Sequence, residues 1–82
     1  MAEYSVYADH LQAFKILARI ANVHGDPSQL FQGRSHQPND VWDKLRVSRN
    51  MVSHFNPDFS LAEFISLLEQ ADLASFCRQQ HV

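Results

Sequence analysis

The side chains best suited to chemistry lie close together in the sequence, between residues 44 and 56. Arg49 carries a fixed positive charge that suits a phosphate contact, and His54 can exchange a proton near neutral pH. Three residues of this segment are basic and none is acidic, although the whole chain has a net charge of -2. The segment is therefore locally positive, and binding of nucleic acid is expected from a local patch and not from the molecule as a whole.

A helix is predicted to carry these residues over the range 40–54. Asn39 or Asp40 can cap its first turn, and Pro57 prevents its continuation. At about 100° per residue, the polar residues capable of proton transfer and phosphate contact share one outward arc of the helix. They are Arg46, Arg49, Asn50, Ser53 and His54. The opposite arc is predicted to face the core and holds Val41, Leu45, Val47, Met51, Val52 and Phe55.

The run Arg49-Asn50-Met51-Val52-Ser53-His54 resembles the Arg-Asn-x-x-x-His motif of HEPN domains, a superfamily of small helical proteins that includes RNA-cleaving toxins and RNA-processing enzymes. In that family the motif ends a helix, and a turn and an amphipathic helix follow it. The resemblance covers Trp42 to about Gln79. Some family members have a Tyr two positions after the His, where this chain has Asn56.

The resemblance implies a dimeric, metal-independent endoribonuclease. Arg49, Asn50 and His54 would be the catalytic residues, while Arg46, Ser53 and Lys44 would bind RNA. Arg49 and His54 point about 140° apart on one helix, so a twofold axis would be needed to bring an Arg and a His to one cleft. The expected partners are RNA, a second copy of the chain, and a protein partner or antitoxin.

A second segment, Arg19-Ile20-Ala21-Asn22-Val23-His24, has the same spacing from Arg to His. It lacks the Asn directly after the Arg and lies inside a predicted helix. We therefore interpret it as a chance match of a short pattern.

Two further helices are predicted around the motif. Apolar residues recur at spacings of three and four over 5–24, on a stripe that includes Tyr7, Leu11, Phe14 and Leu17 and is widened by Val6, Ile20 and Val23. Gly25 is placed to end this helix. Ser60-Leu61-Ala62-Glu63 is a capping box that starts a helix over 60–79, with Phe59 and Phe64 flanking it. Between Gly25 and Asn39 we expect a loop with one short buried turn around Leu30 and Phe31.

These elements predict one all-α domain over residues 1–82, a small antiparallel bundle of three main helices with a HEPN-like fold. A chain of 82 residues excludes a two-domain enzyme and forms a thin core, which favours self-association. One Cys allows no internal disulfide, and no apolar run approaches the roughly 20 residues that cross a membrane. We expect a cytoplasmic or nuclear protein that does not bind membranes.

Neither a metal nor another cofactor is expected. The five His residues are scattered without the spacing of metal ligands. The main alternative to an RNA-processing domain is a non-catalytic helical module for protein-protein interaction or dimerisation, because its polar helix face would look the same. DNA binding is less favoured, since a fifteen-residue loop does not fit a helix-turn-helix motif.

Overall fold

The computed structural model of the chain describes residues 2–78, with side chains described from residue 8 onward. All regular elements in this part of the chain are helical, which confirms the predicted all-α class. They are α1 (Ala2–His24), α2 (Pro27–Arg34), α3 (Val41–Ser53), α4 (Leu61–Gln70) and the short 3-10 helix η1 (Ala74–Cys77).

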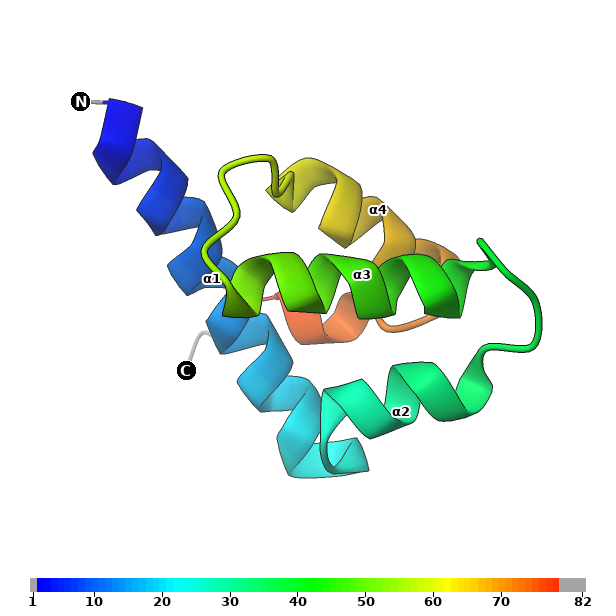
Figure 1. The fold of residues 1–82 in the computed structure, drawn as a ribbon. Coiled ribbons are helices and arrows are strands. Elements are labelled where there is room, and N and C mark those ends of the chain that lie inside the picture. The colour runs from blue at the N-terminus through cyan, green and yellow to red at the C-terminus, as the bar shows by residue number, and fades with distance from the viewer. Residues whose placement is uncertain (1, 79–82) are drawn as a thin grey trace.

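Helices α2, α3 and α4 run in alternating directions, each packed beside the next, as Figure 1 shows. Helix α1 runs obliquely along one side of them, behind the end of α3, and contacts all three, and η1 returns the chain to pack between α1 and α4. The antiparallel arrangement expected of the bundle is therefore found in α2 to α4, while α1 lies across it.

The prediction for residues 25–39 was wrong in part, because α2 is a helix of two turns and not a loop. Asp26 caps it by accepting a hydrogen bond from the Ser28 N–H at 3.0 Å, and Pro27 occupies its first position. Phe31 is fully buried and its ring lies 6.4 Å from that of Trp42. Packing of Phe31, together with the partly buried Leu30, stabilises a helix of only eight residues that would be marginal on its own.

The predicted core stripe of α1 is also shifted from the observed one. Leu11 is 57% exposed and Phe14 is 38% exposed, whereas the buried residues of this helix are His10, Ala13, Ile16, Leu17 and Ile20. Apolar residues occur around most of the circumference of α1, so periodicity alone did not fix which face is buried. Val23 is likewise exposed, and the Val6 and Tyr7 side chains lie outside the described residues.

The predicted end of α1 at Gly25 is confirmed in detail. Gly25 has a φ of 82°, and its N–H donates to the carbonyl of Ala21 at 2.9 Å. This single bond satisfies one of the last carbonyls of α1 and fits the left-handed cap for which glycine is suited.

The start of α4 is formed as the capping box predicts. The Ser60 hydroxyl accepts the Glu63 N–H at 3.1 Å, and the rings of Phe59 and Phe64 lie 5.8 Å apart across the cap.

Ser60→Ala should therefore lower the free energy of unfolding by roughly 1 kcal/mol, because an amide of the first turn loses its partner. Urea denaturation measures this, and an unchanged midpoint would contradict it.

The predicted helix over 60–79 is wrong beyond Gln70. There the chain makes a Schellman turn in which the Leu73 N–H donates to the carbonyl of Leu68 at 2.7 Å and Asp72 takes a φ of 60°. Leu68 and Leu73 are both buried, so burying the second leucine against the core favours the turn over continued helix. Gln79 lies outside the described residues.

Candidate functional site

The residues of the predicted motif lie on the last turn and a half of α3. Asn50, Ser53 and His54 are exposed and Arg49 is half-buried. Within the described part of the chain, none of these four side chains makes a hydrogen bond or an ion pair. Their polar groups are therefore available to a ligand.

Arg49 and Ser53, one helical turn apart, line a surface hollow of about 260 Å³. The opposite wall is formed by the middle of α1 and the start of α2, through Phe14, Leu17, Ala18 and Pro27. A guanidinium beside an apolar wall is less well hydrated than one in open solvent, so its attraction for a phosphate or carboxylate is strengthened there.

Asn50 and His54 occupy the other side of the polar arc. They are four residues apart and so share an edge of the helix, while His54 lies five residues after Arg49 and is turned away from it by about 140°. One molecule thus presents its guanidinium and its imidazole on two different sides of α3.

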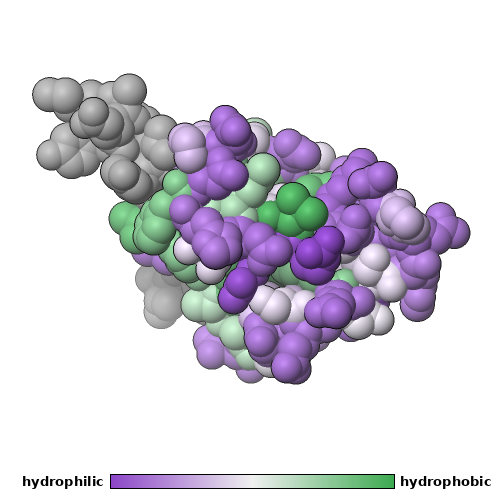
Figure 2. Space-filling view, in the orientation of Figure 1, coloured by the Kyte–Doolittle hydropathy of each residue, from purple (hydrophilic) through white to green (hydrophobic). Residues whose placement is uncertain are grey.

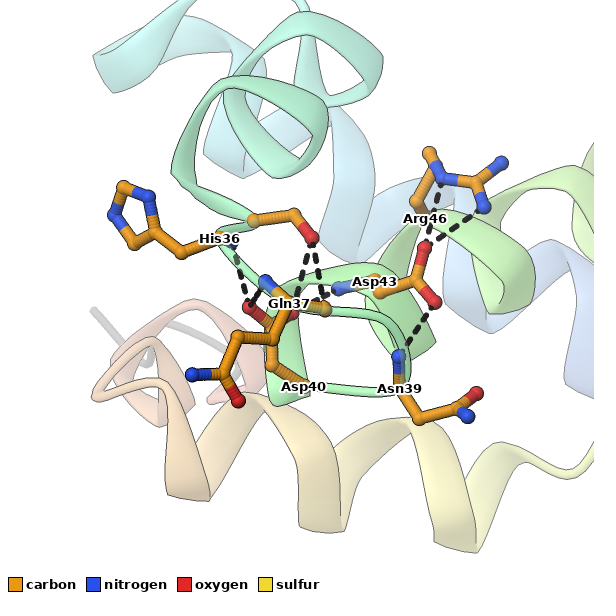
Figure 3. A network of polar contacts seen from close by, with 7 residues as sticks. His36, Gln37, Asn39, Asp40, Asp43 and Arg46 are labelled. Carbon is orange, nitrogen blue, oxygen red and sulfur yellow. Dashed lines mark hydrogen bonds and ion pairs between the residues drawn. The ribbon is translucent and has the colours of Figure 1, made fainter.

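Arg46 is engaged within the protein. Its Nη2 donates to Asp43 Oδ1 at 2.8 Å, and its Nε also donates to that oxygen, at 3.3 Å (Figure 3). The Arg46 hydrogen bond, followed by that from the Asn39 N–H, lowers the pKa of Asp43. The pairing partly neutralises one of the two basic residues, Arg46 and Lys44, that the sequence analysis assigned to RNA binding.

Lys44 is separated from the motif. It lines a groove between α3 and the start of α4 whose floor includes Val47 and Met51 and whose rim carries Asp43, Asp58 and Glu63. Val47 is 42% exposed, which corrects its predicted place in the core. The structure therefore brings Arg49 and Ser53 together but places Lys44 among carboxylates.

The end of α3 is held by an unusual turn. The Asn56 N–H donates to the Met51 carbonyl at 2.8 Å and the Phe55 N–H to that of Val52 at 3.1 Å, which makes a Schellman cap directly after His54. Phe55 occupies the left-handed position of this cap with a φ of 52°. That conformation disfavours a bulky side chain, so neighbouring contacts must stabilise it.

His10 of α1 supplies part of that stabilisation. It is 1% exposed, and its Nε2 lies 2.8 Å from the backbone oxygen of Asn56. A carbonyl can only accept, so Nε2 carries a proton and donates. The His10 ring stacks on Phe55 with a centroid distance of 5.8 Å and also contacts Phe59 at 5.2 Å.

Sequence reasoning did not identify His10 as a residue that acts on the motif. A signal was present, because His10, Ala13 and Leu17 have the spacing of one helix face. A histidine on an apolar face must find a hydrogen-bond partner when it is buried. The partner is a backbone atom 46 residues away, which periodicity does not reveal.

Exposed apolar side chains adjoin the site. Phe55 was predicted to face the core, but it is 49% exposed. Its ring lies 5.9 Å from that of Phe14. Leu11 is one turn before Phe14 on the same face of α1. Figure 2 shows apolar residues gathered toward the left of the molecule, where α1 passes the end of α3. We call Leu11, Phe14 and Phe55 the apolar patch.

The opposite end of α3 is fixed by Asp40, whose carboxylate accepts four hydrogen bonds (Figure 3). The N–H groups of Asp43 and His36 each donate at 2.8 Å, and Gln37 N–H and the Ser35 hydroxyl each donate at 3.1 Å. These bonds, the one from Asp43 first, lower the pKa of Asp40 from 3.8 to about 2. The sequence analysis left open whether Asn39 or Asp40 caps this helix, and in the structure the cap is Asp40.

This lowered pKa predicts acid sensitivity. Asp40 stabilises the fold fully above pH 3.8, and its contribution is lost as the pH falls through about 2. The urea midpoint of Asp40→Asn should be lower than that of the wild type at neutral pH. Between pH 3.8 and about 2 it should also change less than the wild-type midpoint does. Asp9→Asn is the control, because the exposed Asp9 carboxylate accepts no hydrogen bond among the described residues. Equal acid dependence in wild type and Asp40→Asn would contradict the assignment.

Two general properties of the described residues complete the site. No three of their His, Cys, Asp or Glu side chains gather in a way that could hold a metal ion. None of the helices in residues 2–78 combines the length and apolar character that a membrane span requires.

The chain was compared with protein families, curated proteins and solved structures. No family model, no curated protein and no solved structure matches it.

Proposed function

We propose that this chain is a HEPN-like RNA-binding domain that cleaves RNA as a homodimer without a metal ion. The observation that carries the proposal is the end of α3, where Arg49, Asn50 and His54 reach solvent with no partner among the described residues. Because these side chains have no hydrogen bond or ion pair within the described fold to break, they can meet a ligand directly. These three occur in the order and spacing of the Arg-Asn-x-x-x-His motif.

The chemistry would be an attack of a ribose 2′-hydroxyl on the adjacent phosphorus. The imidazole of one His54 accepts the proton of the 2′-hydroxyl while the new P–O bond forms. The bond from phosphorus to the 5′-oxygen breaks, and that oxygen takes a proton from an imidazolium. The products are a 2′,3′-cyclic phosphate and a free 5′-hydroxyl.

Arg49 would stabilise the negative charge that grows on the phosphoryl oxygens, because a guanidinium donates two parallel hydrogen bonds to them. Asn50, which shares an edge of α3 with His54, would orient the phosphate or the imidazole. Ser53 lies beside Arg49 and would contact the RNA backbone. Arg46 and Lys44 contribute charge, reduced by their acidic neighbours.

Dimerisation follows from the divergence of Arg49 and His54 on one helix. A twofold axis beside α3 would place the Arg49 of one protomer near the His54 of its partner and so form two equivalent half-sites in one cleft. The apolar patch adjoins these residues and supplies surface that a contact with a second copy would bury.

The dimer is tested by sedimentation velocity at tens of micromolar. We expect a species of twice the 9.4 kDa protomer mass. Phe14→Ser should shift it toward the monomer, because it places a polar group in the patch. Val23→Ser is the matched control, since Val23 is 66% exposed and lies outside the patch. A wild-type protein that sediments only as a monomer would contradict the dimer.

A second candidate function is supported by the same apolar patch. Three large apolar side chains that share an exposed surface are typical of a protein-binding site. In that case the chain would be a non-catalytic interaction module, with a protein partner or antitoxin covering Leu11, Phe14 and Phe55. Incubation with RNA separates the two, because only the first function shortens the RNA above the rate of a blank.

A further inference from the structure

We propose that a groove between α1 and η1 binds the phosphodiester backbone of single-stranded RNA, at a place separate from the motif on α3. The groove has a volume of about 550 Å³. Its lining comes from the second half of α1 and from η1 with the residue that follows it: Arg19, Asn22, Val23, Ser75, Phe76 and Arg78. The proposal rests on the proposed function in that it takes RNA as the ligand.

Arg19 is held in place before any ligand arrives. It is half-buried, and its Nη1 donates to the backbone oxygen of Phe76 at 3.0 Å. A guanidinium has five N–H donors, so this bond leaves others for the groove. Fixing the side chain against η1 lowers the entropy that binding would otherwise cost.

The polar groups of the groove favour an anion. Two guanidinium groups, an amide and a hydroxyl line it, and none of the described residues that line it is acidic. Glu69 is an acidic residue near this lining. Burial raises the pKa of Cys77, the negative charge of Glu69 raises it further, and the positive charge of Arg19 lowers it. The lining itself carries a charge of +2 from Arg19 and Arg78, on a protein with a net charge of -2.

The apolar part of the lining favours a nucleic acid over an acidic peptide or a lone phosphate. The Phe76 ring is fixed by an edge contact with His24, with centroids 5.7 Å apart and an angle of 68°. An aromatic ring in the same lining as two arginines offers a base a stacking surface while its phosphates meet the charges, which is how single strands are commonly bound.

The groove and the motif are connected across α1. Phe14, Leu17 and Ala18 line the hollow of Arg49, and Arg19, Asn22 and Val23 line the groove, so the two lie on opposite flanks of one helix. At about 100° per residue, the exposed Lys15 lies on the same arc of α1 as Arg19 and Asn22, one turn before Arg19. A helix with its side chains is about 10–12 Å across, so a few nucleotides could span it.

The test is fluorescence anisotropy with a short labelled uridine RNA over a range of salt concentrations. All proteins carry His54→Ala, so that cleavage does not consume the probe. Arg78→Gln should weaken binding several-fold at low salt and reduce the slope of log affinity against log salt by about 0.7, the value for one lost phosphate contact on a single strand. Arg19→Gln should do the same.

Arg34→Gln is the matched control. It removes the same charge from the surface, but Arg34 lies over the Trp42 ring at 5.1 Å and outside the groove. It should leave both affinity and slope unchanged. Thermal unfolding of each variant checks that the fold is retained.

Three outcomes would overturn the groove as an RNA site: no binding of the RNA by the parent protein, equal weakening by Arg78→Gln and Arg34→Gln, or displacement of the RNA by polyglutamate as effective as by unlabelled RNA. Absence of the proposed nuclease activity would not by itself overturn the groove as an RNA site. Binding that depends on Arg78, together with no RNA cleavage by the protein with His54 intact, would support the groove and contradict the nuclease.

Discussion

His54→Ala and Arg49→Ala should each reduce RNA cleavage by two or more orders of magnitude. General acid-base catalysis contributes about 10²–10⁴ in rate, and stabilisation of the phosphoryl charge contributes about 10²–10³. The fold should survive both changes, because His54 is exposed and neither side chain makes a hydrogen bond within the described residues. Cleavage is followed on a labelled RNA by gel, in EDTA, with the cyclic phosphate end identified by mass.

His36→Ala is the matched control for this experiment. The His36 side chain is exposed in the connection between α2 and α3, and only its backbone N–H is used, toward Asp40. Cleavage should be unchanged. Equal RNA decay by wild type and His54→Ala would contradict the catalytic proposal and favour the non-catalytic interaction module.

The other large expected effect is on stability. His10→Ala should lower the free energy of unfolding by about 3 kcal/mol, since it leaves a cavity among the Phe55 and Phe59 rings and deprives the Asn56 carbonyl of a donor. Chemical denaturation measures the loss, again with His36→Ala as the variant that should resemble the wild type. A change below about 0.5 kcal/mol would mean that the His10 contacts do not hold the turn.

His10→Gln refines the same experiment. A glutamine amide can donate to the Asn56 carbonyl but cannot reproduce the ring contacts. If the hydrogen bond provides most of the stabilisation, this variant should recover a large part of the loss seen with alanine. If the rings provide most of it, the two variants should unfold alike.

Local signals in the sequence predicted the boundaries of the helices well wherever a cap is encoded by neighbouring residues. Ser60 with Glu63, Asp40 ahead of Val41, and Gly25 all act as expected. These features depend on backbone amides within a few residues, so the sequence contains the whole interaction.

Features that depend on tertiary packing were predicted poorly. The turn after Gln70 requires the core to bury Leu73, and the two-turn helix α2 requires Phe31 to pack against Trp42. Neither partner is apparent from a window of a dozen residues. The buried face of α1 was ambiguous for the same reason, because only its neighbours decide whether His10 or Leu11 turns inward.

The candidate site shows the same division. The motif on α3 was found from the types and order of its residues, and its exposure could be anticipated from the helical wheel. The pairing of Arg46 with Asp43 could have been anticipated too, since residues three apart on a helix are neighbours. The hollow beside Arg49 and the groove beside Arg19 could not, because each is formed by residues from two or three separate elements.

The oblique position of α1 also bears on how the chain folds. Helices α2, α3 and α4 each pack against their neighbour in the sequence, whereas α1, besides packing on α2, reaches across to α4 and η1, with hydrogen bonds that join residues 46 and 57 positions apart. Local pairings form fastest, so the α2 to α4 hairpins should assemble on a microsecond to millisecond scale and α1 should dock last. The strained turn at Phe55 would then be completed only at that final step, and the kinetic barrier would be sensitive to α3 and α4 but not to His10.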